Sequence, residues 1–109
     1  MTESLPEVPA AGVPAEGWLL DVREDDEWTA GHAPAATHIP LGQLGARSAE
    51  VPRDEQVYVI CRSGVRSARA THALNEAGWR AVNVAGGMQD WAAAGLPMVT
   101  DSGAAPFVA

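Results

Sequence analysis

Cysteine, lysine and most aromatic residues are scarce in this chain. Its 109 residues include one cysteine, one phenylalanine, one tyrosine and no lysine. The single cysteine, Cys61, excludes an intramolecular disulfide and a cysteine-rich zinc module, so any reaction of its thiol involves a second molecule. No apolar run approaches the roughly 18 residues of a membrane span, and the N-terminus lacks a charged start followed by an apolar stretch. We therefore expect a soluble, cytoplasmic protein without a membrane partner.

The length and composition of the chain are those of one globular domain. A length of 109 residues suits a single domain, and 47% of the residues are hydrophobic. A chain of this size buries roughly 65% of its unfolded surface, which is enough to fold without covalent staples. The core must be built mainly from alanine, valine and leucine with the four tryptophans.

Charge is unevenly distributed along the chain. With 14 acidic and 7 basic residues the net charge is -7, which argues against nucleic acid as a partner. Residues 56–75, however, contain no acid and include Arg62, Arg66 and Arg69, so this segment carries +3 and the rest carries -10. A positive patch on an acidic protein favours a pocket for a small anion. The alternative is a solvated helix face that happens to lack acids.

The N-terminal third predicts an extended segment, a strand and a short helix. Residues 1–17 hold three prolines, which disfavour a continuous helix, so we expect an extended arm with a possible edge strand near residues 7–8. The apolar run 18–22 has the length of a strand. In residues 23–31, acids crowd the first turn of a short helix that ends at a glycine, where negative charge complements the helix dipole. The ligand spacing of a calcium loop is missing.

The rest of the chain alternates strands with helices. The run 57–60 is β-branched and aromatic, as in a central parallel strand covered on both faces. In the helix predicted over 65–77 the inner face is formed by Ser67, Ala70, Leu74 and Ala77, and Gly78 ends the helix. Further predicted elements are a small strand at 37–39, a helical or irregular stretch over 41–49, a strand at 81–84, a tight turn at Gly86 and Gly87, and a last helix that contains Trp91 and is closed by Gly95 and Pro97.

This alternation predicts an α/β fold with a mainly parallel central sheet flanked by helices on both faces. Sheets of this type place their sites outside the carboxyl ends of the strands. Cys61 is the first residue beyond the clearest central strand, so we expect its thiol at that edge.

The segment 61–67 joins the central strand to the next helix. Such a loop can curl so that backbone N–H groups converge on one point in front of the helix N-terminus, which makes an anion site. Gly64 gives the backbone freedom for the curl, and Ser63 and Ser67 offer further donors. The helix N-terminus and a nearby arginine favour the thiolate of Cys61. We interpret Cys61 as an activated nucleophile, against the alternative of an inert buried thiol.

The sequence Cys-Arg-Ser-Gly-Val-Arg-Ser at 61–67, preceded by Val-Tyr-Val-Ile, resembles the active-site loop of the rhodanese-like sulfurtransferases. Segments 19–24, 31–40 and 84–91 resemble the same family in order and spacing. We divide the chain into a proline-rich N-terminal arm (1–17), a rhodanese-like domain (18–98) and a C-terminal tail (99–109). Ala35 stands where the family usually has glycine, away from the loop.

The resemblance implies a sulfurtransferase that needs no cofactor and no metal. Its Cys61 thiolate takes the outer sulfur of thiosulfate or a similar small anionic donor, becomes a persulfide, and passes the sulfur to a thiol or protein acceptor. The resemblance implies substrate-binding roles for Arg62, Ser63, Gly64, Val65, Arg66 and Ser67. It also implies that Asp21 and Arg23 form a hydrogen-bonded structural pair near the site; we expect His32 to pack at its turn as a third structural residue.

Two other functions remain open. Cysteine phosphatases and arsenate reductases use a similar cradle, but by resemblance their arginine comes six positions after the cysteine, where this chain has Ser67. A noncatalytic or persulfide-carrying interaction module is the alternative from another class; loss of the cysteine is its usual mark, and Cys61 is present. Without a second cysteine, a persulfide awaits an external acceptor.

Overall fold

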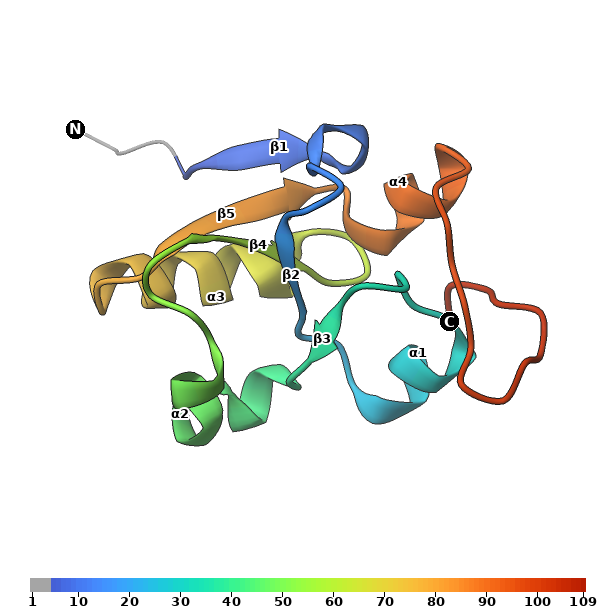
Figure 1. Cartoon of the computed structure of the whole chain (residues 1–109), viewed down its shortest axis with the longest axis horizontal. Coiled ribbons are helices and arrows are strands. Elements are labelled where there is room, and N and C mark those ends of the chain that lie inside the picture. Colours follow the sequence, from blue (N-terminus) through green and yellow to red (C-terminus); the bar gives the residue numbers. More distant parts are fainter. Residues whose placement is uncertain (1–4) are drawn as a thin grey trace.

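Five parallel strands form one sheet in the computed structural model, which describes residues 5–109 (Figure 1). The strand order is β1-β5-β4-β2-β3, so β4 is the middle strand. The strands are β1 (Glu7–Pro9), β2 (Trp18–Asp21), β3 (Thr37–His38), β4 (Gln56–Ile60) and β5 (Arg80–Ala85). Parallel neighbours require crossover connections, which the helices between them supply.

Four α-helices connect or follow these strands: α1 (Asp25–Ala30), α2 (Leu44–Arg47), α3 (Val65–Glu76) and α4 (Gly87–Ala93). Three 3-10 turns add to them: η1 (Ala10–Gly12), η2 (Leu41–Gln43) and η3 (Ser48–Glu50). Helices α2 and α3 cover one face of the sheet, and α4 with η1 covers the other.

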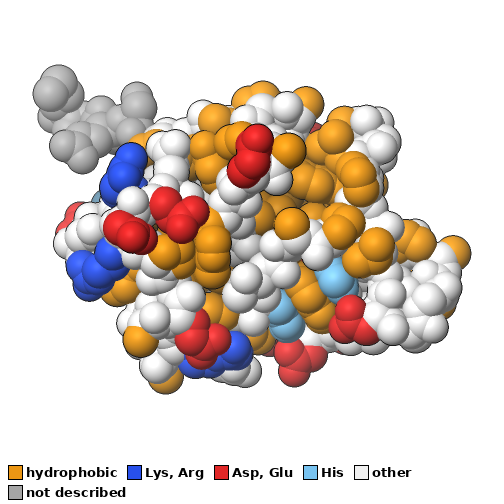
Figure 2. Space-filling view, viewed as in Figure 1, with side chains coloured by type: hydrophobic (Ala, Val, Ile, Leu, Met, Phe, Trp, Pro, Cys, Tyr) orange, Lys and Arg blue, Asp and Glu red, His pale blue; other side chains and the backbone are white. Residues whose placement is uncertain are grey.

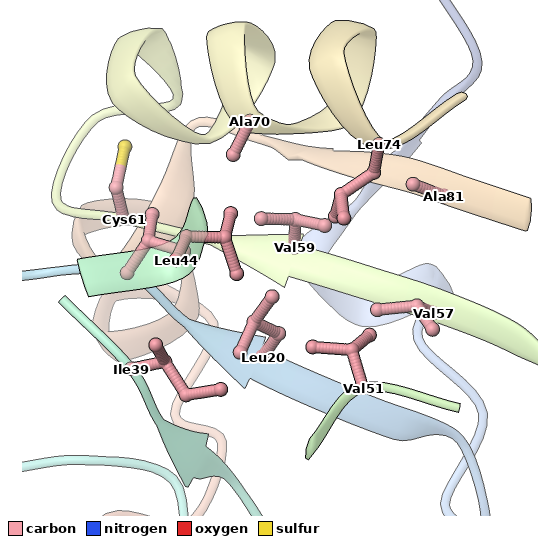
Figure 3. Close-up of a cluster of buried hydrophobic side chains, with 11 residues drawn as sticks. Leu20, Ile39, Leu44, Val51, Val57, Val59, Cys61, Ala70, Leu74 and Ala81 are labelled. Carbon is pink, nitrogen blue, oxygen red and sulfur yellow. The ribbon is translucent and has the colours of Figure 1, made fainter. Parts of the chain in front are cut away.

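Two hydrophobic clusters lie on the two faces of the sheet, and β4 alternates between them. Val57 and Val59 pack with α3 on one face (Figure 3), whereas Tyr58 and Ile60 pack with α4 on the other. A strand with apolar side chains on both faces is stable only when helices cover both. The predicted α/β fold with helices on both faces is confirmed.

Most predicted elements are present within a residue or two of their expected ends. The edge strand near residues 7–8 is confirmed, because β1 pairs in parallel with β5. Residues 1–4 of the predicted arm lie outside the described part of the chain. The division into an arm, a domain and a tail stays a prediction.

The predicted inner face of α3 is wrong at one position. Ser67, Ala70 and Leu74 are buried, but Ala77 is exposed and Thr71 is buried in addition. The helix ends at Glu76, and the chain then turns at a glycine with a φ of 102°. Ala77 therefore lies in the helix cap, where the 3.6-residue period no longer sets the direction of the side chain.

No helix in residues 5–109 is long and apolar enough to cross a membrane.

Candidate active site

Cys61 lies where β4 ends and the loop to α3 begins, at the carboxyl edge of the middle strand. In Figure 3 its sulfur points toward the N-terminal end of α3. Gly64 precedes the helix with a φ of 103°, a left-handed conformation that glycine adopts without strain. This conformation lets the loop fold back over the sulfur, as the sequence predicts.

Hydrogen-bond donors from this loop and from the first turn of α3 face the sulfur of Cys61. The backbone N–H of Gly64 lies 3.1 Å from Sγ, and the Ser67 hydroxyl donates to Sγ at 3.3 Å. Burial, with Cys61 only 1% exposed, raises the pKa of the thiol. The hydrogen bonds from the Ser67 hydroxyl and from the backbone N–H groups of Ser67, Gly64 and Ser63 more than offset it, so the pKa of Cys61 lies below its ordinary value. The loop therefore stabilises the thiolate of Cys61 relative to that of an ordinary cysteine.

Helix α4 holds the loop from behind. The N–H of Met88 donates to the Cys61 carbonyl at 2.8 Å, and the N–H of Gln89 donates to the Arg62 carbonyl at 3.0 Å. Gly87, with a φ of 54°, makes this approach possible: a Cβ there would lie 2.7 Å from the Arg62 carbonyl oxygen. These contacts turn the loop carbonyls away from the sulfur and leave the N–H groups toward it. The sequence predicts only a tight turn at this glycine.

Asn83 on β5 also supports the loop. Its side-chain N–H₂ donates to the Gly64 carbonyl at 3.3 Å and to the Glu7 carboxylate at 2.9 Å. In the sequence, Asn83 stands out as a polar residue within an apolar strand. That pattern does not show which carbonyl its side chain contacts.

One of the three arginines in the acid-free stretch, Arg66, is neutralised by a carboxylate, and the small-anion pocket expected there stays a prediction. Arg66 donates to both carboxylate oxygens of Glu27 on α1, at 2.6 and 2.8 Å. Arg62 is exposed and its Nε donates to the Ala109 carbonyl at 2.9 Å. Arg69 lines a groove between α2 and α3. The acid-free stretch of sequence thus receives a carboxylate from elsewhere in the chain.

The two partners of the Arg66–Glu27 pair shift each other's ionisation. The hydrogen bond from Arg66 is the main cause that lowers the pKa of Glu27 from 4.5 to about 2. The same contact raises the pKa of Arg66, to which the nearby Cys61 thiolate also contributes. Both residues are therefore charged throughout the neutral range.

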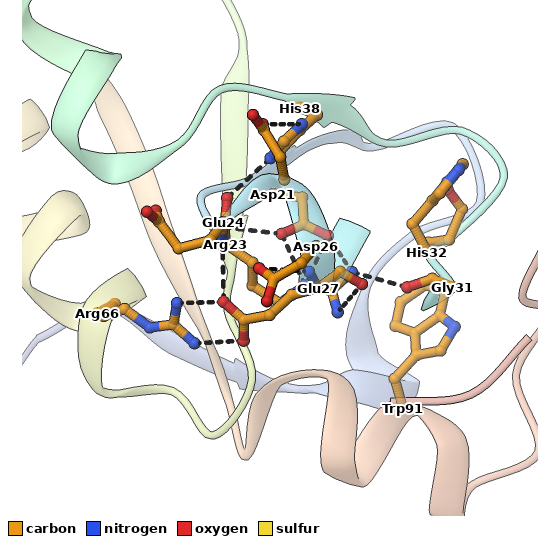
Figure 4. A network of polar contacts seen from close by, with 12 residues as sticks. Asp21, Arg23, Glu24, Asp26, Glu27, Gly31, His32, His38, Arg66 and Trp91 are labelled. Carbon is orange, nitrogen blue, oxygen red and sulfur yellow. Dashed lines mark hydrogen bonds and ion pairs between the residues drawn. The ribbon is translucent and has the colours of Figure 1, made fainter. Parts of the chain in front are cut away.

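Asp21 and Arg23 form a fully buried ion pair at the end of β2 (Figure 4). Arg23 Nη2 and Nε donate to the Asp21 carboxylate at 2.7 and 2.9 Å. The guanidinium also donates to the backbone carbonyls of Glu27 and Gly31, at 3.2 and 2.9 Å. Because these carbonyls belong to α1 and its cap, the pair fixes α1 against the sheet and thereby places Glu27 next to Arg66.

His32 is buried and stacks on Trp28, with ring centroids 3.5 Å apart. Its ring nitrogens lie within hydrogen-bonding distance of the Ala33 carbonyl, at 3.1 Å, and of the Asp101 carboxylate, at 3.2 Å. Both nitrogens thus have partners outside the Cys61 loop. A structural role for His32 stays a prediction, as it does for Asp21 and Arg23.

The remaining loop residues, Ser63 and Val65, are exposed, and Val65 leaves 63% of its surface open. Their side chains are open to solvent, whereas the sulfur is buried, and the backbone N–H of Ser63 is among the donors that lower the pKa of Cys61. Within residues 5–109, no group of three or more histidine, cysteine, aspartate or glutamate side chains is arranged to hold a metal ion.

A separate apolar pocket of about 320 Å³ lies between the segment 10–17, residues 33–35 and Trp91. Figure 2 shows hydrophobic side chains gathered on this part of the surface. The lining contains no charged side chain, so it offers nothing to hold an anion. The chemistry of the molecule therefore concentrates at the Cys61 loop, where a stabilised thiolate faces backbone donors.

Comparisons with known proteins point to one family. Residues 7–94 match the family described as the rhodanese-like domain. The chain is 42% identical over 76 residues to "Putative sulfurtransferase YtwF" of Bacillus subtilis, covering 70% of this chain and 74% of the relative. It is also 42% identical to "Putative sulfur carrier protein YrkF" of the same organism, covering 67% of this chain but only 40% of that relative. A solved rhodanese-related protein from Thermoplasma volcanium superposes with a TM-score of 0.83 at 33% identity, covering 88% of this chain and 99% of the other.

Proposed function

This chain belongs to the rhodanese-like domain family, and on that premise we propose that it is a sulfurtransferase acting through a persulfide on Cys61. The donor is thiosulfate or a similar small anion, and the acceptor is a thiol or a protein. The observation that supports this most strongly is the hydrogen bonding of the sulfur: a thiol that is 1% exposed accepts hydrogen bonds from Gly64 and Ser67 that lower its pKa. An inert core cysteine needs no such donors.

In the first step, the Cys61 thiolate attacks the outer sulfur of thiosulfate. A new S–S bond forms to Cys61, the S–S bond of thiosulfate breaks, and sulfite leaves with the bonding electron pair. The negative charge of the thiolate passes to the terminal sulfur of the persulfide. The thiolate form, which the hydrogen bonds of the loop stabilise, is the nucleophile, so this step itself transfers no proton.

The negative charge of the persulfide lies on its terminal sulfur, one bond beyond the sulfur of Cys61. Hydrogen-bond donors are therefore needed at that position. The first N–H groups of α3 have no carbonyl partner within the helix, and we assign Val65 and Arg66 to this role through their backbone. In the second step, a nucleophilic acceptor attacks the terminal sulfur, and Cys61 leaves as the same hydrogen-bonded thiolate. The cradle stabilises the leaving group of the second step as it stabilises the nucleophile of the first.

Persulfide carriage is a second candidate function. It is favoured by the absence of a second cysteine in these 109 residues, so that no internal disulfide can discharge the persulfide. The similarity to a relative named as a sulfur carrier points the same way. A carrier and an enzyme differ in turnover: the carrier holds one sulfur until its own partner takes it.

The test is steady-state formation of thiocyanate from thiosulfate and cyanide. We expect the chain to turn over many times, the Cys61→Ser variant to be inactive, and Arg47→Ala, a change at an exposed ion pair, to retain activity. Transfer of one sulfur per protein without turnover supports persulfide carriage. Full activity of Cys61→Ser refutes both the sulfurtransferase and the carrier function. The cytoplasmic location and the absence of a nucleic-acid partner stay predictions of the sequence.

A further inference from the structure

The Arg66–Glu27 pair holds the cationic side chain next to the Cys61 loop. The guanidinium and carboxylate meet through two hydrogen bonds, at 2.6 and 2.8 Å, a fork geometry that gives strong charge-assisted bonds (Figure 4). The Arg66 side chain is 32% exposed and that of Glu27 only 14%. The pair is therefore partly shielded from water and salt.

Contacts other than the one with Arg66 also hold Glu27 in place. Its Oε1 accepts a hydrogen bond at 3.0 Å from the N–H of Glu24, which closes the capping box of α1. Its backbone carbonyl is tied to the buried Arg23 at 3.2 Å. A carboxylate held at both its backbone and its side chain costs little further conformational entropy when it binds the guanidinium.

A second arginine–glutamate pair in the chain provides an internal comparison. Arg47 and Glu50 also meet through two hydrogen bonds, at 2.8 and 3.0 Å, but their side chains are 37% and 48% exposed. Exposed pairs of that kind contribute little. The Arg66–Glu27 pair also has two hydrogen bonds, made through Nη1 and Nη2, and its carboxylate is more buried.

We propose that Glu27 tunes the donor preference of the site by neutralising Arg66, which shifts that preference from doubly charged toward singly charged sulfane-sulfur donors. This inference rests on the proposed sulfur transfer through Cys61. A dianionic donor such as thiosulfate gains most from cations beside the loop. Glu27 neutralises Arg66 and leaves Arg62, which donates to a backbone carbonyl. Glu27 acts through Arg66 and is therefore a positioning residue.

Thiosulfonates are the matching singly charged probes. With methanethiosulfonate, the Cys61 thiolate attacks the outer sulfur, the S–S bond of the donor breaks, and methanesulfinate leaves with the electron pair. The product on the protein is the same persulfide as with thiosulfate. The two donors therefore test the charge of the donor with the chemistry at Cys61 unchanged.

The substitution Glu27→Gln frees the charge of Arg66 while the amide oxygen still completes the capping box. Coulomb energy is proportional to the charge of the ligand, so the logarithm of the gain for a dianion is about twice that for a monoanion. We expect kcat/KM to rise about tenfold for thiosulfate and about threefold for methanethiosulfonate, mostly through KM, as order-of-magnitude values for a partly screened charge.

The experiment measures kcat/KM for both donors with cyanide as the acceptor. Glu27→Asp, which keeps the charge, should retain the wild-type ratio of the two donors. Glu50→Gln should also retain it, because the arginine that it frees is exposed and its charge is screened by water and salt. In an Arg66→Ala background, Glu27→Gln should have no effect on the ratio.

The inference is overturned if Glu27→Gln changes kcat/KM equally for the two donors or leaves both unchanged. The proposed function still stands in that case, provided that the wild type turns over. An effect of Glu27→Gln that persists without Arg66 overturns it as well. If the wild type takes sulfur from neither donor, as read by intact mass, the proposed function fails and this inference fails with it.

Discussion

The hydroxyl of Ser67 should set much of the reactivity of Cys61, and Ser67→Ala tests this directly. The hydroxyl donates to Sγ at 3.3 Å, and both residues are almost fully buried, at 0% and 1% exposed. A hydrogen bond to a charged group contributes about 1.5–3 kcal/mol. Because sulfur is a weak acceptor we take the low end, which is about one pKa unit. Removing the donor disfavours the thiolate, so the pKa of Cys61 should rise by about one unit.

The assay is the rate of alkylation of Cys61 by iodoacetamide across pH, followed by intact mass. Below the pKa of the wild-type thiol, the variant should react about tenfold more slowly than wild type at the same pH, since a rise of one unit lowers the thiolate fraction about tenfold. Ser63→Ala is the matched control: this residue lies in the same loop, and its exposed side chain is not bonded to the sulfur. The reasoning is refuted if Ser67→Ala keeps the wild-type pH profile, or if Ser63→Ala shifts it as much.

Three further substitutions test the frame around the site. The pKa of Glu27 is about 2 in the folded protein and 4.5 in the unfolded chain, so Glu27 stabilises the fold above pH 4.5 and this stabilisation is lost as the pH falls toward 2. Chemical denaturation should show Glu27→Gln to be less stable than wild type by on the order of 2 kcal/mol at pH 7. The difference should shrink below about pH 4. Gly87→Ala should lower the melting temperature sharply because its Cβ would lie 2.7 Å from a loop carbonyl oxygen, whereas Gly45→Ala, with open space around it, should not; equal melting temperatures would contradict the close approach. Asp21→Asn leaves the fully buried Arg23 without its counter-charge and should cost about 3–5 kcal/mol of unfolding free energy, and a cost under about 1 kcal/mol would show that the pair contributes little.

The fold was predictable because each strand and helix is indicated by residues that are close together in the sequence. The run 57–60 is apolar at every position, which is what a middle strand with two covered faces requires, and it is the middle strand. The curl of the loop after it was predictable in part for the same reason, because a cysteine, a glycine and a serine stand there at short spacing, although contacts from α4 and Asn83 also hold the loop. Gly64 and Ser67 both donate to the sulfur of Cys61, whereas the sequence indicated only backbone freedom at Gly64 and a further donor at Ser67.

The charge of the site was not predictable in the same way. The acid-free stretch 56–75 suggested an uncompensated positive patch, but Glu27 reaches Arg66 from 39 positions away. That contact depends on where α1 sits, which depends in turn on the buried Arg23. The role of Gly87 is also nonlocal, because a glycine in a turn does not reveal which backbone lies against it. Sequence patterns describe neighbours along the chain and leave out those brought together by the fold.

Intact mass of the protein after exposure to thiosulfate tests the central claim most directly. Persulfide formation at Cys61 predicts that the wild type gains one sulfur atom, that cyanide removes it, and that Cys61→Ser gains nothing. The gain should be one atom and no more, since the chain has a single cysteine. A wild-type protein that gains no sulfur, or a Cys61→Ser variant that gains it equally, would contradict the claim.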